Sequence, residues 1–116
     1  MNNVPERYRI KSSQQILEIK HFGDSFSDSN LVLVKKRNKL CYPRYAVIAS
    51  KTVGGAVQRN RCKRRLRNRA NAYLDKIKPD YDILLIARQA TLNCSPAELD
   101  RTFYNLFKKA KLLEAE

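Results

Sequence analysis

The chain has 116 residues, and its 24 lysines and arginines outnumber its 11 acidic residues to give a net charge of +13. This length fits one small domain, the 43% hydrophobic residues suffice for a modest core, and no apolar run is long enough to span a bilayer. The N-terminus lacks the apolar stretch of a signal peptide, so we expect a single domain over residues 1–116 that acts in the cytoplasm without a membrane partner.

The first predicted elements are a helix followed by strands. Ser12 is a helix N-cap with Gln15 at capping-box spacing, and Gly23 ends the helix. Residues 24–30 are rich in turn formers and include a short edge strand. Residues 31–34 form an apolar strand, residues 35–43 a basic hairpin loop, and residues 45–50 a strand with two differently used faces.

A long helix follows the Gly54-Gly55 break and reaches about Lys76. At 100° per residue its buried stripe consists of Cys62, Leu66, Ala70, Tyr73 and Ile77. The side opposite this stripe carries Asn60, Arg61, Arg64, Arg65 and Asn68, with Arg67 on a flank. Arg59, in the first turn, is placed to reach round the end of the helix.

Residues 82–88 read as a central strand buried on both faces, and Pro96 opens the last helix with Ser95 as N-cap and Glu98 closing a capping box. The buried face of this helix comprises Leu99, Phe103, Leu106, Phe107 and Ala110. The predicted order is helix, two or three strands, helix, strand, helix. The strands on either side of the central helix are expected to be parallel neighbours.

The positive charge is concentrated in the middle of the chain. Residues 29–74 contain thirteen cations and no acid, and residues 59–69 alone contain six arginines and one lysine. Cations spaced four apart, such as Arg61 and Arg65, repel each other along a helix, and an anionic partner offsets that cost. Guanidinium groups bind phosphates in a bidentate manner, and amides such as Asn60 and Asn68 can contact base edges or 2′-hydroxyls. A polyanion partner is therefore favoured over a merely solvated face.

A second basic set surrounds this helix. It consists of Arg7, Arg9, Lys11, Lys35, Lys36, Arg37, Lys39, Arg44 and Lys51. The aromatic residues among these cations are Tyr8, Phe22, Phe26, Tyr42 and Tyr45. Aromatic side chains next to cations can stack on single-stranded bases, although some of the five must belong to the core.

No catalytic set is evident in the sequence. The acids are scattered, His21 has no obvious partner, and there is no phosphate-binding glycine loop for a small-molecule substrate. The three widely spaced cysteines fit reduced, small apolar side chains better than a metal site. These features predict a binding protein.

Residues 45–71 read YAVIASKTVGGAVQRNRCKRRLRNRAN and closely resemble the signature of the bacterial ribonuclease P protein family. The matching positions are Ser50, Lys51, Val53, Gly54, Ala56, Val57, Arg59, Asn60, Arg61, Lys63, Arg64 and Arg67, while Thr52 replaces a usual lysine. The resemblance extends to residues 7–11, to residues 81–88 and to the start of the last helix.

The resemblance implies an α+β fold. It is a two-layer sandwich with a mixed sheet of about four strands and three helices, in the order α-β-β-β-α-β-α. The basic helix lies in a left-handed crossover between parallel strands, whereas the ordinary expectation is right-handed.

The resemblance also implies a protein subunit of an endoribonuclease. Its partners are ribonuclease P RNA, which carries the catalytic groups, and precursor tRNA, whose 5′ leader is removed in a Mg²⁺-dependent hydrolysis. The Mg²⁺ is bound mainly by the RNA subunit and the substrate. The residues implied to contact the RNA subunit are Arg59, Asn60, Arg61, Lys63, Arg64 and Arg67, and helix geometry adds Arg65 and Asn68.

The leader cleft implied by the resemblance lies between the first helix and the sheet. Its expected residues are Arg9, Lys11, Ile16, Lys20, Val34 and Lys51. Ile16, Lys20 and Val34 occupy positions that are often aromatic in the family, and a local shift would let Phe22 substitute. Two other classes stay open: a non-catalytic nucleic-acid-binding module, ribosome-associated or DNA-binding, and a stand-alone nuclease.

Overall fold

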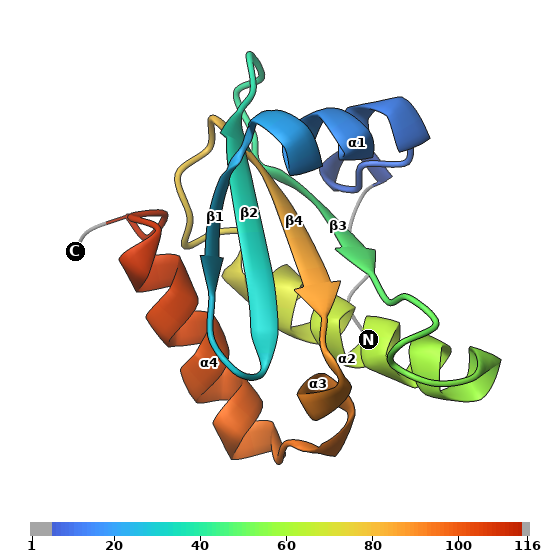
Figure 1. Ribbon diagram of the computed structural model, residues 1–116. Coiled ribbons are helices and arrows are strands. Elements are labelled where there is room, and N and C mark those ends of the chain that lie inside the picture. The colour runs from blue at the N-terminus through green and yellow to red at the C-terminus, as the bar shows by residue number, and fades with distance from the viewer. Residues whose placement is uncertain (1–5, 115–116) are drawn as a thin grey trace.

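The computed structural model describes residues 6–114 (Figure 1). Its elements are η1 (Glu6–Tyr8), α1 (Ser13–Phe22), β1 (Asp24–Ser27), β2 (Leu31–Arg37), β3 (Arg44–Ile48), α2 (Ala56–Tyr73), β4 (Tyr81–Ala87), α3 (Gln89–Asn93) and α4 (Pro96–Lys109). The predicted α+β class is confirmed, with a four-stranded sheet and three main helices, α1, α2 and α4. The short α3 is not among the elements predicted from the sequence.

The sheet has the strand order β1-β2-β4-β3. β4 is antiparallel to β2 and parallel to β3, so it separates the two strands that precede it in the chain. The predicted hairpin over residues 35–43 is therefore wrong. Residues 35–37 extend β2, and residues 38–43 connect strands that do not pair with each other.

The crossover from β3 to β4 runs through α2. In Figure 1 both strands point downward, α2 passes behind the sheet, and β4 lies to the left of β3. This arrangement is a left-handed crossover, as the resemblance implies, and it is the less common hand.

The larger core lies between the sheet and the pair α2 and α4. The stripe of Cys62, Leu66 and Ala70 is fully buried against the sheet, which confirms the predicted helical register. The helix ends at Tyr73 rather than Lys76, because a turn there brings Ile77 opposite Leu113 in an isolated β-bridge.

The start of α4 is also as predicted. The Ser95 hydroxyl accepts a hydrogen bond from the backbone N–H of Glu98 at 3.1 Å, and the Glu98 carboxylate accepts one in return from the Ser95 N–H at 3.3 Å. The helix then buries the five residues expected to form its apolar face. Burial of its two phenylalanines, Phe103 and Phe107, makes this helix a main contributor to the core.

The smaller core lies on the other face, under α1. The helix crosses a row of three side chains, Val34, Leu84 and Ala46, which are aligned on β2, β4 and β3. The backbone comes very close where α1 meets β1. A Cβ atom on Gly23 would lie 2.6 Å from the Ile19 carbonyl oxygen and 2.7 Å from that of Lys35. Glycine is required here by space rather than by backbone conformation, since its φ is −82°.

Candidate nucleic-acid interface

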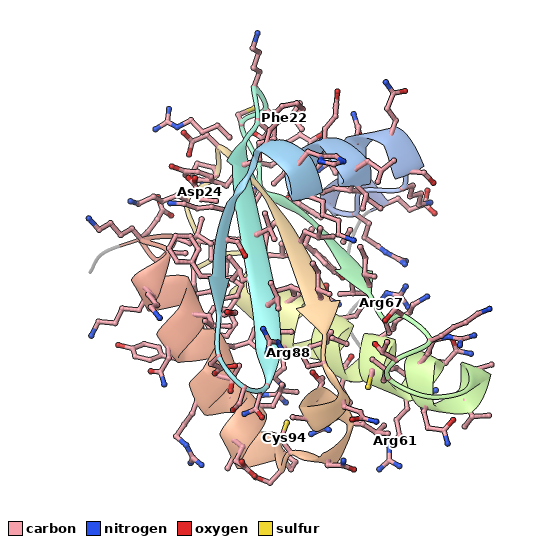
Figure 2. The ribbon with its side chains drawn as sticks, in the orientation of Figure 1. Phe22, Asp24, Arg61, Arg67, Arg88 and Cys94 are labelled. Carbon is pink, nitrogen blue, oxygen red and sulfur yellow. The ribbon has the colours of Figure 1, made fainter. Side chains whose placement is uncertain are left out.

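The outer face of α2, defined by Asn60, Arg61, Arg64 and Asn68, is exposed along the helix. Figure 2 shows Arg61 projecting from α2 away from the strands. Among residues 6–114 neither arginine pairs with an acidic side chain. Two guanidinium groups one helical turn apart, flanked by two amides, form a surface suited to phosphates.

Arg65 is placed differently from the prediction. Its guanidinium donates hydrogen bonds to the carbonyl oxygens of Thr91 at 2.7 Å, Leu92 at 3.3 Å and Cys94 at 2.6 Å. The last carbonyl groups of a helix have no hydrogen-bond donor within that helix, and Arg65 provides the donors for those at the end of α3. Arg65 thus joins α2 to α3, and the expectation that it projects into solvent with Arg61 and Arg64 is wrong.

Two further arginines of α2 also make contacts within the protein. Arg69 pairs with Asp100 on α4. Arg59 reaches round the start of the helix, as expected, and donates to the carbonyl oxygen of Gly54 at 3.2 Å. Gly54 has a φ of 148°, a conformation that favours glycine, and no side chain caps the first turn of α2. The free backbone N–H groups in the first turn of α2 add to the positive potential at this end of the helix.

Lys63 and Arg67 lie half-buried on the flank of α2 that faces β3. Figure 2 shows Arg67 on the strand side of the helix. Burial lowers the pKa of the Arg67 guanidinium, and the nearby charge of Arg9 lowers it further. Beneath them the buried Tyr45 hydroxyl donates to Asn71 Oδ1 at 2.7 Å. Arg9 and Arg67 thus repel each other, and neither forms an ion pair among residues 6–114, so a bound phosphate would relieve this repulsion.

The second surface is an open strip of sheet beside α1. Val32, Ile86 and Ile48 are aligned across three strands on the α1 face, one row beyond the row that α1 covers. All three are half-buried and line the strip with aliphatic side chains. Arg88 follows on the same face of β4, and Figure 2 shows it at the lower end of the strands.

The residues predicted for the leader cleft are only partly brought together. Ile16 and Lys20 lie one turn apart on the side of α1 facing the strip, and Ile16 packs on its edge. Val34 is only 4% exposed beneath α1, so its assignment as a contact residue is wrong. Lys11 is exposed but paired with Glu6 at 2.8 Å.

Three more positions complete the comparison with the predicted cleft. Lys51 is exposed in the turn after β3, and Arg9 forms a β-bridge with Tyr45 at the start of that strand. Phe22 is 77% exposed, but at 100° per residue it lies on the Glu18 side of α1, away from the strip. Phe22 therefore does not take the place of the missing aromatic residues.

A recess of about 350 Å³ lies on the side of α1 that faces away from the strip. It is lined by Gln15, Glu18, Ile19, Lys36, Arg37, Asn38, Lys39, Leu40, Arg44 and Asp82. The buried Asp82 binds Arg44 through contacts of 2.7 and 3.0 Å, and this hydrogen bonding raises the pKa of Arg44. Asp82 also accepts from the Asn38 side chain at 2.8 Å, which anchors the loop over residues 38–43.

Several acids of the protein are already engaged. Glu6, Asp80, Asp82 and Asp100 each pair with a lysine or arginine. Within residues 6–114 no three His, Cys, Asp or Glu side chains are grouped as metal ligands would be. The described helices also include none with the length and apolar character of a membrane span.

Comparison with known proteins decides the family. The model of the family described as Ribonuclease P matches residues 4–111. The chain belongs to this family. The match includes both surfaces described above and the whole sheet that carries them.

Curated members of the ribonuclease P family resemble the chain over most of its length. The "Ribonuclease P protein component" of Oceanobacillus iheyensis is 34% identical over 112 residues, which is 96% of this chain and 93% of that protein. The protein of the same name from Clostridium kluyveri is 38% identical over 107 residues, covering 90% and 96% of the two chains.

Solved structures of the ribonuclease P family agree with the fold. The RNase P protein of Staphylococcus aureus superimposes with a TM-score of 0.83 at 29% identity, covering 92% of this chain and 98% of that one. The RNase P protein of Thermotoga maritima, at 23% identity, shares the fold with a TM-score of 0.78 over 87% of this chain and 96% of that one.

Proposed function

We propose that this chain is the protein subunit of a ribonuclease P ribonucleoprotein in the cytoplasm, and that it binds the catalytic RNA through the outer face of α2. The main support is the unpaired state of Arg61 and Arg64 within the described residues, on a helix whose opposite stripe is buried. Folded RNA presents closely spaced phosphates and 2′-hydroxyls, which match the guanidinium and amide groups of this face.

The strip beside α1 is the proposed binding site for the 5′ leader of precursor tRNA. Lys20 and Arg88 stand on opposite sides of the Val32–Ile86–Ile48 row, where each can reach a phosphate of an extended strand. The aliphatic floor offers packing surface without aromatic rings. We therefore expect the leader to be held by its backbone and by nonspecific apolar contact, with little discrimination among bases.

In this proposal the RNA subunit performs the endonucleolytic hydrolysis that produces the mature 5′ end of the tRNA. Mg²⁺, bound mainly by the RNA subunit and the precursor, supplies the hydrolytic chemistry. The protein binds and orients the two RNAs, and its cations reduce their mutual repulsion. Four of its acids, Glu6, Asp80, Asp82 and Asp100, are held in ion pairs within the described residues, which fits a role without direct catalysis.

The test mixes the protein with a bacterial ribonuclease P RNA and precursor tRNA at low Mg²⁺. Stimulated leader removal is expected. RNA binding without stimulation would favour the nucleic-acid-binding module, and cleavage without added RNA subunit would favour a stand-alone nuclease. As a matched control, Lys108→Ala with Lys109→Ala removes two charges from α4 and is expected to leave stimulation intact, whereas Arg61→Ala with Arg64→Ala reduces it.

Leader binding is tested with two substitutions on the same helix. Lys20→Ala removes a cation beside the strip and is expected to weaken holoenzyme binding of precursor tRNA but not of mature tRNA. Phe22→Ala removes a large, exposed side chain from the other side of α1 and is expected to change neither. Equal loss of both ligands with Lys20→Ala, or a loss confined to Phe22→Ala, would refute the assignment of the strip.

A further inference from the structure

Two tyrosines and an arginine meet at the start of β3. The rings of Tyr8 and Tyr42 pack edge to face with centroids 5.5 Å apart. The Arg7 guanidinium carbon lies 5.1 Å from the centre of the first ring and 5.3 Å from that of the second. Both tyrosines are half-exposed and Arg7 is exposed, so ring and guanidinium surfaces remain open to solvent.

The backbone holds this cluster in place from two sides. The N–H of Ile10, two residues after Tyr8, donates to the Tyr45 carbonyl at 2.8 Å. Tyr42 sits in the loop anchored by Asn38, whose side chain binds Asp82 at 2.8 Å and accepts from the Leu40 N–H at 3.0 Å. A cluster fixed in this way loses little conformational entropy when a ligand stacks on it.

The unpaired charges of Arg7 and Arg9 at the cluster are positive. Arg9 follows Tyr8 and forms a β-bridge with Tyr45, whose hydroxyl donates to Asn71 of α2 at 2.7 Å, so Arg9 lies between the cluster and the flank of α2 that carries Arg67. Glu6 is nearby, but its carboxylate is paired with Lys11 at 2.8 Å. Positive charge therefore continues from α2 across the start of β3 to the tyrosines.

We propose that Arg7, Tyr8, Arg9 and Tyr42, the β3-edge platform, bind an unpaired segment of the RNA subunit, with bases stacked on the tyrosines and phosphates on the arginines. The combination of exposed rings and cations suits single-stranded RNA, whose bases are free to stack. The RNA subunit is the favoured source because the platform continues the α2 surface through Arg67. This inference rests on the proposed function and extends the interface beyond α2.

The chain provides its own probe for this test. Cys41, next to Tyr42, is exposed, while Cys62 and Cys94 are buried, and burial raises the pKa of Cys62 and so suppresses its reactive thiolate. An iron chelate attached to Cys41 in the assembled holoenzyme will cleave RNA near the platform with hydroxyl radicals. Cleavage of an unpaired segment of the RNA subunit is expected. Cleavage only in the precursor leader, or none, would overturn the proposal, and Cys41→Ser gives the background.

A second measurement separates stacking from charge. Tyr8→Leu with Tyr42→Leu is expected to weaken RNA-subunit binding by about fivefold or more, since one stacked base contributes at least that much. The salt dependence should stay unchanged, because no charge is lost. The matched pair Tyr8→Phe with Tyr42→Phe keeps the rings and should bind like the unaltered protein. Equal affinity of the Leu and Phe pairs would refute stacking, even if the unaltered protein stimulates leader removal and so satisfies the proposed function.

Discussion

Arg64 and Arg65 are neighbours in the sequence, yet the fold gives them different roles. Arg64 lies on the exposed outer face of α2 and pairs with no acid among the described residues, whereas Arg65 donates to three carbonyl oxygens beyond it in the chain. One step of 100° around the helix separates a candidate RNA ligand from a structural bridge. The number of cations on this helix thus overstates the number available to a partner.

Leu66→Asp is expected to unfold the protein, because it detaches α2 from the sheet and so removes both roles of the helix. Leu66 is completely buried, and an unpaired carboxylate there costs several kcal/mol, comparable to the whole stability of a small domain. The cooperative thermal transition should disappear, along with RNA binding. The control is Leu66→Met, which keeps volume and polarity and should fold; a normal transition for the Asp variant would contradict the register of α2.

Arg61→Ala with Arg64→Ala tests the outer face alone. Each lost charge-assisted contact is expected to lower affinity for the RNA subunit on the order of tenfold. The slope of log affinity against log salt should become shallower by about 1.4 to 1.8 for two phosphate contacts. The melting temperature should stay close to that of the unaltered protein, because neither side chain is packed. Unchanged affinity at fixed salt would remove the central support for the proposed function.

Arg65→Ala is expected to lower the stability of the fold while leaving RNA affinity nearly unchanged. Leaving the carbonyls after α3 without their charged donor should destabilise the fold by about 1.5–3 kcal/mol, which corresponds to a melting temperature roughly 6–15 °C lower in a domain of this size. RNA affinity of the folded fraction should barely change. Arg65→Lys is the informative control, since a point charge cannot serve three acceptors at once and should recover only part of the loss. A large loss of RNA affinity without destabilisation would return Arg65 to the interface.

The smallest effect is expected for Arg69 and Asp100. This pair is partly exposed on both sides, so its contribution is about 0–1 kcal/mol. Asp100→Asn should leave the melting temperature nearly unchanged while freeing the Arg69 charge toward solvent. A modest gain in RNA affinity at low salt, absent in Arg69→Ala with Asp100→Asn, would show that acids of α4 limit the available charge.

Much of the fold follows from local sequence, because local rules specify it. The stripe of Cys62, Leu66 and Ala70 obeys helical spacing, and Ser95 with Glu98 caps α4 as their separation predicts. The hairpin prediction is wrong because the order of strands in the sheet cannot be read from any local segment. Strand order depends on β4, which lies between β2 and β3 although residues 49–80 separate it from β3 in the chain.

Other differences between prediction and structure arise from long side chains that reach distant partners. Lys35 and Lys36 suggested a loop, yet β2 continues through them because a long lysine can bury its stem and place its charge elsewhere. Lys35 Nζ donates to the Ala110 carbonyl at 2.6 Å, a partner 75 residues away. The position of Arg65 cannot be predicted locally for the same reason, since its acceptors are backbone atoms of α3 and of its C-cap Cys94, and this five-residue helix has too little periodicity to be predicted.

The contact at Gly23 has a consequence for how this protein can vary. There is no room for a methyl group between the end of α1 and β2, so the helix is docked as close to the sheet as two backbones can lie. The distance between the end of α1 and the sheet is therefore fixed by the absence of a side chain at Gly23. Relatives that keep this contact are expected to vary the strip through the side chains around it, such as those at Ile16 and Lys20, because the end of α1 has no space to move closer to the sheet.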